Sequence, residues 1–182
     1  MLEYLKEMKA ASDSYIKLEE KLNTEIEEIK NKYINLIDKT GMTEEIEEVE
    51  KKLDMVKEKT INDIKDISSK AIKATREWGR PTSENIKDIG ILQLDLNEDE
   101  IIDLLDYHKN NPVMVKELQK YARNKGMKKA PYLQYDTVEN RIEKIKNVQD
   151  IILKGISSNH VYWNMYIRNK EAMDKLIEPI GG

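Results

Sequence analysis

The side chains that could act as acids, bases or metal ligands are scattered along this chain. His108 and His160 are its two histidines, and cysteine is absent. Its carboxylates mostly precede or follow a lysine by three or four residues, as Glu3 and Lys6 do, and such pairs usually solvate a helix. No nucleophile, phosphate-binding or zinc-binding motif occurs. We therefore expect a protein that is not an enzyme and holds no cofactor.

One stretch has the spacing of a calcium loop. Asp95, Asn97 and Asp99 match the first three ligand positions of an EF-hand. The glycine that the loop needs at its sixth position is replaced by Glu100, and its bidentate glutamate by Asp106. Asn97 followed three residues later by Glu100 instead fits the start of a helix. We expect no metal here.

The residues around 98–129 could bind nucleic acid. Two short helices are predicted at 98–109 and 112–125, joined by an Asn-Asn-Pro break, as in a helix-turn-helix. The candidate contacts to nucleic acid or to an acidic partner are Lys116, Lys120, Arg123, Lys128 and Lys129. The first helix is strongly acidic, however, and the sequence pI is about 5.5. The pattern therefore favours an acidic protein surface, in this fold or on a neighbouring copy, over nucleic acid.

The last predicted helix, at about 159–177, is rich in aromatic residues and methionine. Such residues are enriched where proteins meet, so Tyr162, Trp163 and Tyr166 are candidate partner-binding residues. The alternative is that they pack as ordinary core against a helix at 137–154, which ends at Gly155. The pattern favours core packing for most of this helix, with part of its circumference left for a partner.

Two long amphipathic helices must carry these shorter ones. Apolar residues recur in steps of three and four from Leu2 to Asp38 and again from Thr43 to Trp78, which predicts a coiled-coil-like antiparallel hairpin. The seam of the first helix is interrupted at Ser12 and Glu19. Residues 39–42 form the predicted turn, and Thr43 is the predicted cap of the second helix.

The rest of the chain predicts a compact bundle of about five shorter helices. Glycine and proline punctuate it where helices would end or begin, and no stretch alternates as a strand would. We expect an all-α protein with a hairpin domain at 1–78 and a helical domain at 79–182.

Residues 94–127 read LDLNEDEIIDLLDYHKNNPVMVKELQKYARNKGM. This stretch resembles small helical proteins from the structural gene modules of tailed phages and prophages, in which an acidic capped helix, an Asn-rich break and a helix ending in YA…G follow one another. The resemblance covers about a fifth of the chain and contains no catalytic motif. It implies a scaffolding or virion-assembly role and assigns no role to any single residue.

These patterns together predict a structural or assembly protein that self-associates through its hairpin and docks other assembly proteins. A nucleic-acid-binding regulator, and a phage-encoded inhibitor that covers a host factor's basic site with the acidic residues 84–106, are the alternatives. No stretch has the apolar length of a membrane span, and the charged N-terminal residues differ from a signal peptide. We therefore expect a cytoplasmic or virion location and no membrane partner.

Overall fold

The chain is built from helices. The computed structural model describes residues 1–157 and 161–178. Its elements are α1 (Leu2–Tyr33), α2 (Thr40–Trp78), α3 (Ser83–Asp88), the 3-10 helix η1 (Ile89–Gln93), α4 (Glu98–Tyr107), α5 (Pro112–Asn124), the 3-10 helix η2 (Ala130–Tyr132), α6 (Val138–Ser157), α7 (Val161–Arg168) and α8 (Lys170–Ile177). No strand occurs within the described ranges. The predicted all-α class, with a long helix pair and shorter helices, is confirmed.

Contacts divide the chain into two compact units. The hairpin unit comprises residues 2–69 and 146–178, and the middle unit comprises residues 70–145. This grouping differs from the expected division after residue 78, because α7 and α8 at the C-terminal end pack on α1. Sequence periodicity detects helices but not which distant helix covers which face, so it could not show this return of the chain.

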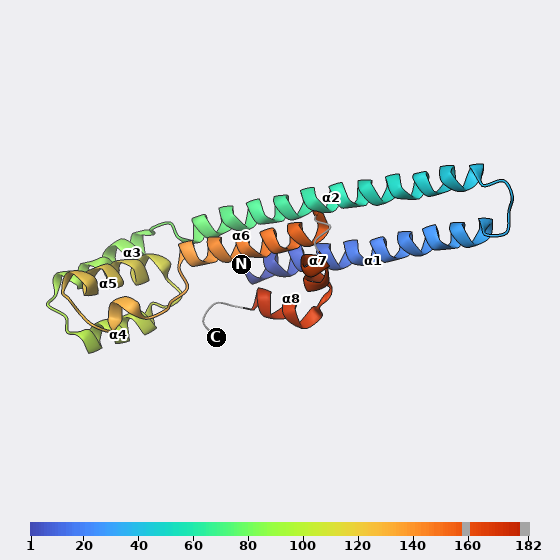
Figure 1. Ribbon diagram of the computed structural model, residues 1–182. Helices are drawn as coiled ribbons and strands as arrows, with labels where there is room; N and C mark the ends of the chain where they lie inside the picture. The colour runs from blue at the N-terminus through green and yellow to red at the C-terminus, as the bar shows by residue number, and fades with distance from the viewer. Residues whose placement is uncertain (158–160, 179–182) are drawn as a thin grey trace. The chain divides into compact units, whose positions relative to one another are not determined.

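The hairpin is antiparallel, as Figure 1 shows for α1 and α2. Its register is fixed by two ion pairs between the helices, Lys32 with Glu45 at 2.8 Å and Lys52 with Glu25 at 3.8 Å. In both pairs the two residue numbers have the same sum, as two antiparallel helices in one register require. Leu22 and Val49 are buried along the shared seam. The coiled-coil-like pairing predicted from the heptads therefore forms within one chain.

The turn of the hairpin lies earlier in the sequence than predicted. α1 ends at Tyr33 and α2 begins at Thr40, so the turn comprises residues 34–39. Asp38 accepts hydrogen bonds from the backbone N–H and the hydroxyl of Thr40, at 3.0 and 2.7 Å. The prediction of Thr43 as the cap was wrong because Asp38 supplies the capping carboxylate several residues earlier. Leu36, which periodicity placed in the seam, lies in the turn instead.

The core of the hairpin unit lies where α6 joins the two long helices. Its fully buried side chains include Leu5 and Met8 of α1, Ile64 of α2, and Val148 and Ile152 of α6. The Ser68 hydroxyl donates a hydrogen bond to the Gln149 side chain at 2.6 Å, which links α2 to α6. α6 of the same chain thus covers part of the apolar surface of the two long helices.

Ser12 explains the first interruption of the seam and provides a test of the core. Its side chain is completely buried, and its Oγ has no hydrogen-bond partner among the described residues. Because an unsatisfied buried hydroxyl is costly, Ser12→Ala should raise the free energy of unfolding by about 1 kcal/mol. Ser68→Ala, which removes the bonded hydroxyl, should lower it by about 1 kcal/mol. Urea denaturation of both variants measures the two signs, and equal losses would contradict the assignment.

The middle unit has its own core between α4 and α5. Its buried side chains are Ile101, Leu105, Met114, Val115, Leu118, Ala122 and Ala130. The helix starts follow the sequence signals: Thr82 caps α3, Asn97 caps α4 and Asn111 caps α5, each by accepting a backbone N–H. Gly126, after α5, adopts a φ of +68°, which glycine reaches without strain. The start of α4 at Asn97 and the break before Pro112 were predicted from the sequence.

The C-terminal helices differ from the prediction at two points. α6 continues through Gly155 to Ser157 instead of ending there. The single helix expected at 159–177 is two helices, because Asn169 accepts the N–H of Ala172 at 3.1 Å and starts α8. Residues 159 and 160 of the expected helix lie outside the described residues.

Candidate functional site

The three candidate partner-binding aromatics of α7 form one cluster. The ring centroid of Tyr162 lies 5.0 Å from that of Trp163 and 6.4 Å from that of Tyr166, and Trp163 and Tyr166 are 6.1 Å apart. The ammonium group of Lys154 lies 5.4 Å from the Trp163 centroid, within cation–π range. The structure therefore brings together the residues that the sequence marked.

The cluster lies on the outer side of α7 rather than in the core. Ile167 is the buried residue of this helix, whereas Val161, Tyr162 and Met165 are 70, 64 and 65% exposed. Trp163 and Tyr166 are half-buried. Core packing, which the pattern favoured for most of this helix, therefore does not hold for Tyr162, while Trp163 and Tyr166 are partly covered. Helical periodicity could not decide this, because apolar residues surround most of α7.

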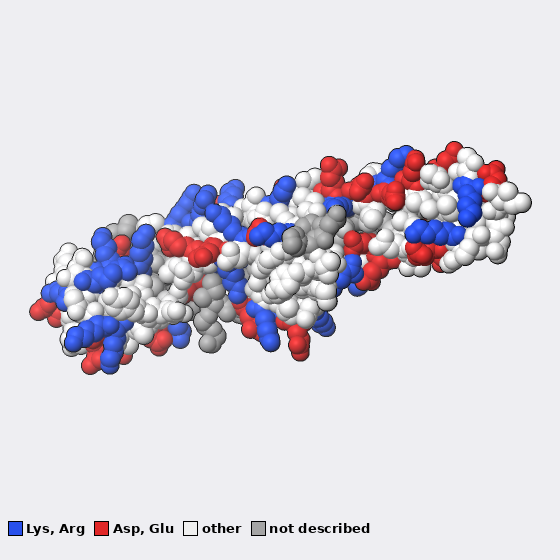
Figure 2. All heavy atoms as spheres, in the orientation of Figure 1, with Lys and Arg blue, Asp and Glu red and all other residues white. Residues whose placement is uncertain are grey.

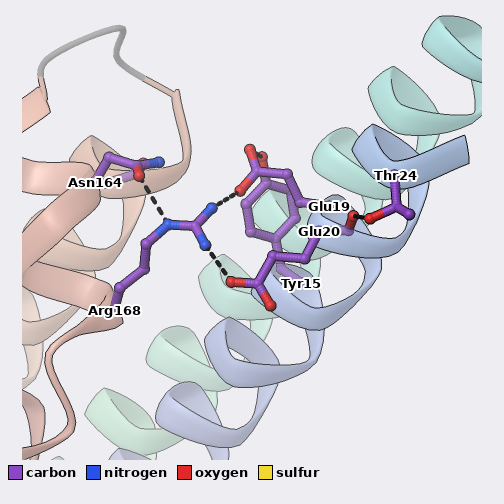
Figure 3. A network of polar contacts seen from close by, with 7 residues as sticks. Tyr15, Glu19, Glu20, Thr24, Asn164 and Arg168 are labelled. Carbon is purple, nitrogen blue, oxygen red and sulfur yellow. Dashed lines mark hydrogen bonds and ion pairs between the residues drawn. The ribbon is translucent and has the colours of Figure 1, made fainter. Parts of the chain in front are cut away.

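A hydrogen-bond network holds α7 against α1 (Figure 3). The guanidinium of Arg168 pairs with Glu20 at 2.6 Å and with Glu19, and its Nε donates to Asn164 at 2.9 Å. Tyr15 donates its hydroxyl to Glu19 at 2.8 Å. Burial, reinforced by this bond to a carboxylate, raises the pKa of Tyr15 well above its usual range. One arginine thus bridges two carboxylates one residue apart.

This network explains the second interruption of the hairpin seam. Glu19 stands where the heptad calls for an apolar residue, and its side chain is largely shielded from solvent while bound to Arg168 and Tyr15. The carboxylate of Glu19 thus attaches α7 through Arg168, which is 149 residues away in the sequence. The signal available in the sequence was the misplaced carboxylate, but its partner could not be identified from periodicity.

An open cleft of about 370 Å³ lies beside the exposed face of α7. Its apolar lining is Leu53, Ile156, Val161 and Met165, and its polar lining is Tyr15, Glu19, Asp54, Lys57 and Asn164. α6 contributes Ile156, one residue before its end at Ser157. The cleft therefore begins where α6 ends. On the side toward the start of α1, α6 itself covers the apolar surface of the hairpin.

The basic residues of the middle unit lie on the outer face of α5. Lys116, Lys120 and Arg123 follow at helical spacing and are exposed, while Met114 and Leu118 point into the core. Lys116 is 3.9 Å from Glu139 and Lys120 is 3.8 Å from Glu117. Such loose exposed pairs contribute little stability, so these ammonium groups can turn to another partner.

The other basic residues of this segment are held differently. Lys125 forms a 2.6 Å ion pair with Asp95. Lys128 and Lys129 are exposed, and the backbone N–H of Lys129 donates to Glu98 at 2.5 Å. This bond, with a second from Ala130, lowers the pKa of Glu98. The acidic α4 thus secures the loop after α5 and leaves the row on α5 outward.

Asn97 and Glu100 form the capping box that the sequence predicted. The Asn97 side chain accepts the N–H of Glu100 at 3.0 Å, and the Glu100 carboxylate accepts the N–H of Asn97 at 2.8 Å. Within the described residues, His, Asp and Glu side chains form no group of three or more that could hold a metal ion. In the same part of the chain, every helix is too short or too polar to cross a lipid bilayer.

The comparisons with known proteins add no relative. No family model matches the chain, and no curated protein or solved structure is significantly similar to it. The surfaces described above therefore carry the functional argument.

Proposed function

We propose that this chain is a non-enzymatic structural protein that acts by helix-mediated self-association and by docking other assembly proteins. The observation that carries the proposal is the exposed apolar face of α7 beside the cleft at the end of α6. Val161 and Met165 line the cleft together with Leu53, and Tyr162 is exposed on the same helix. Residues of these types dominate the buried centres of protein interfaces.

The occupant that we propose for the cleft is the hairpin of a second copy. In one chain, α6 fills the space along α1 and α2 only as far as Ser157. Farther along the hairpin, Leu18 and Met55 are exposed and Leu53 and Val56 are only half-buried. A second hairpin would bring the same heptad pattern to this stripe and complete a bundle of four helices.

The setting that we propose for this assembly is a phage particle. The support is the resemblance of residues 94–127 to structural-module proteins of tailed phages. An assembly role also agrees with the two kinds of surface present, an apolar face on the hairpin unit and a basic row on the middle unit. Complementary charge at such a row sets specificity and association rate more than affinity.

Self-association can be measured by sedimentation velocity and light scattering over the micromolar range. Wild type should show a mass that rises with concentration. Tyr162→Ser with Met165→Ser should weaken association about 30-fold, the effect of losing one interface hot spot. Both residues are exposed, so the helical fold should persist by circular dichroism.

Leu94→Ser is the matched control, because Leu94 is an equally exposed apolar residue of the middle unit. It should leave association unchanged. A wild-type chain that remains monomeric at every concentration would refute the proposed function. If Leu94→Ser weakens association as much as the α7 variant does, the cleft is not the site of self-association.

A further inference from the structure

The turn of the hairpin presents three large apolar side chains to solvent. Ile34, Leu36 and Ile37 are 65, 49 and 105% exposed. On the face that Figure 2 shows, the tip of the hairpin is largely uncharged, with charged side chains on the helices behind it. Single exposed leucines are ordinary, but contiguous exposed apolar residues mark an interaction site. These side chains are exposed and so add little to the packing of the hairpin. Their apolar character is therefore better explained by a binding partner.

The turn is held in one conformation rather than loosely tethered. Directly below it, Glu45 accepts hydrogen bonds from the Tyr33 hydroxyl at 2.7 Å and from Lys32 at 2.8 Å, which ties the two helices together. Asp38 fixes the start of α2 through Thr40. A preorganised loop loses less conformational entropy when it binds than a flexible loop does. This arrangement suits docking.

The charge around the turn restricts what can bind it. Residues 25–50 contain nine Asp and Glu and three Lys, a net charge of −6. A membrane with anionic headgroups would repel this collar, even though the apolar turn could enter it. The matching surface is one with exposed apolar side chains inside a rim of positive charge.

The middle unit carries both the positive charge and the exposed apolar side chains from which such a surface could be built. Residues 107–129 contain seven Lys and Arg and one Glu, a net charge of +6. The outward row on α5 is Lys116, Lys120 and Arg123, and two large aromatic residues of the same unit, Tyr107 and Tyr132, are 82 and 78% exposed. In Figure 2, basic side chains lie on two sides of an uncharged area in the region of α4 and α5, and acidic side chains also border it.

We propose that the hairpin turn of one copy docks on the basic face of α5 in a second copy. Ile34, Leu36 and Ile37 would pack among the exposed aromatic residues, and the acidic collar would face the basic row. The proposal rests on the self-association described above and adds a second, different contact to it. The two surfaces of this contact are unlike, so a bound pair still offers one free turn and one free basic face.

A contact of this kind has two measurable consequences. Copies add in a row or close into a ring, so species larger than a dimer should form. The contact should also weaken as salt rises, because exposed charges are screened beyond about 8 Å at physiological ionic strength. The cleft contact, in which the exposed apolar side chains of α7 take part, should respond less to salt than this contact does.

The decisive experiment mixes two variants of the full chain, both made in the Tyr162→Ser, Met165→Ser background. The turn variant is Ile37→Asp, and the face variant is Lys120→Glu with Arg123→Glu. Each alone should lose head-to-tail association about 30-fold, as for a lost hot spot. Mixed at equal amounts, they should form a one-to-one dimer by native mass spectrometry, because each keeps the surface that the other lacks.

Leu94→Asp and Lys146→Glu are the matched controls, since both residues are exposed and lie outside the turn, the row on α5 and the cleft. They should behave as the background does. If wild type associates but the turn variant associates as well as its Tyr162→Ser, Met165→Ser background does, or the mixture stays monomeric, the head-to-tail contact is wrong while the proposed function stands. If wild type never associates, both fail.

A short DNA duplex at low salt tests the other possible occupant of the basic face. The head-to-tail contact predicts that the duplex does not bind at concentrations where the copies associate. Binding that disappears in the face variant, together with unchanged association of the turn variant, would assign the row on α5 to nucleic acid and overturn the proposal.

Discussion

Gly155→Val should detach α7 from α6 and lower the free energy of unfolding by about 3 kcal/mol, the upper range for overpacking a core. A Cβ at Gly155 would lie 2.6 Å from Cγ2 and 2.7 Å from Cδ1 of Ile167, closer than carbon atoms approach. Ile167 is buried and branched at Cβ, so it cannot rotate away freely. The glycine is thus a point of contact between two helices.

The consequence reaches the candidate interaction face, because α7 carries both the aromatic cluster and Arg168. If α7 is displaced, the cleft should lose its wall of Val161 and Met165. We therefore expect Gly155→Val to reduce self-association as well as stability. Urea denaturation gives the free energy, and sedimentation at a temperature where the variant is folded gives the association.

A double-mutant cycle distinguishes the clash with Ile167 from the general loss of stability that replacing a glycine with valine can cause. Ile167→Ala opens space, so Gly155→Val should cost less in that background, with a coupling of about 1–2 kcal/mol. Gly90→Val is the control, since a Cβ at Gly90 meets nothing within 4 Å. Additive effects of the Gly155 and Ile167 substitutions would show that the close approach is not what the glycine provides.

Gly155 also illustrates what the sequence could and could not predict. A glycine after a periodic run serves equally to end a helix or to let another helix approach, and the two uses have the same local pattern. Gly126 and Gly155 looked alike, yet the first adopts a positive φ after α5 and the second lies within α6. Only the position of Ile167 distinguishes them.

Features set by neighbouring residues were predictable. The hairpin follows from heptads, and the caps at Thr82, Asn97 and Asn111 follow from short polar side chains placed before apolar runs. Features set by distant residues were not. In the sequence, Glu19 only interrupts the apolar seam, and its ion pair with Arg168 is visible only in the structure.

The candidate surfaces were predictable as residue types but not as faces. The aromatic residues of α7 were marked for partner binding, yet whether they pointed inward depended on where α7 packs. The exposed turn was missed, because periodicity extended α1 through Leu36 to Asp38, whereas α1 ends at Tyr33. Asp38 could have revealed the turn, because aspartate is favoured at helix starts and its carboxylate accepts the N–H of Thr40.

Arg141→Ala should lower the free energy of unfolding by about 2–3 kcal/mol, somewhat less than the loss of a fully buried ion-pair partner. The Nε and a terminal nitrogen of Arg141 both lie 2.6 Å from Oδ2 of Asp136. The guanidinium also stacks on Trp78, 3.5 Å from the ring centroid. Both charged side chains are about four-fifths buried, so water screens them poorly.

The loss of unfolding free energy comes mainly from the Asp136 carboxylate, which stays buried after Arg141 is removed. Oδ1 of Asp136 is buried and has no partner among the described residues, so the carboxylate depends on Arg141 for its compensation. Removing the arginine leaves a shielded negative charge with neither oxygen paired to a cation, which is costly. Asp136→Asn in the Arg141→Ala background should therefore regain about 1 kcal/mol, because a neutral amide is cheaper to bury than a charge.

Arg141→Lys tests the stacking separately. Lysine keeps the positive charge but lacks the flat guanidinium that covers Trp78 and binds in a fork, so it should lose about 1 kcal/mol. In a Trp163→Tyr background, Trp78 is the sole tryptophan, and its fluorescence should shift to longer wavelength in Arg141→Ala as the ring meets water. A stability equal to wild type in Arg141→Ala, with an unshifted emission maximum, would mean that the ion pair does not stabilise the start of α6. It would also mean that the stacking does not anchor the start of α6 to the end of α2.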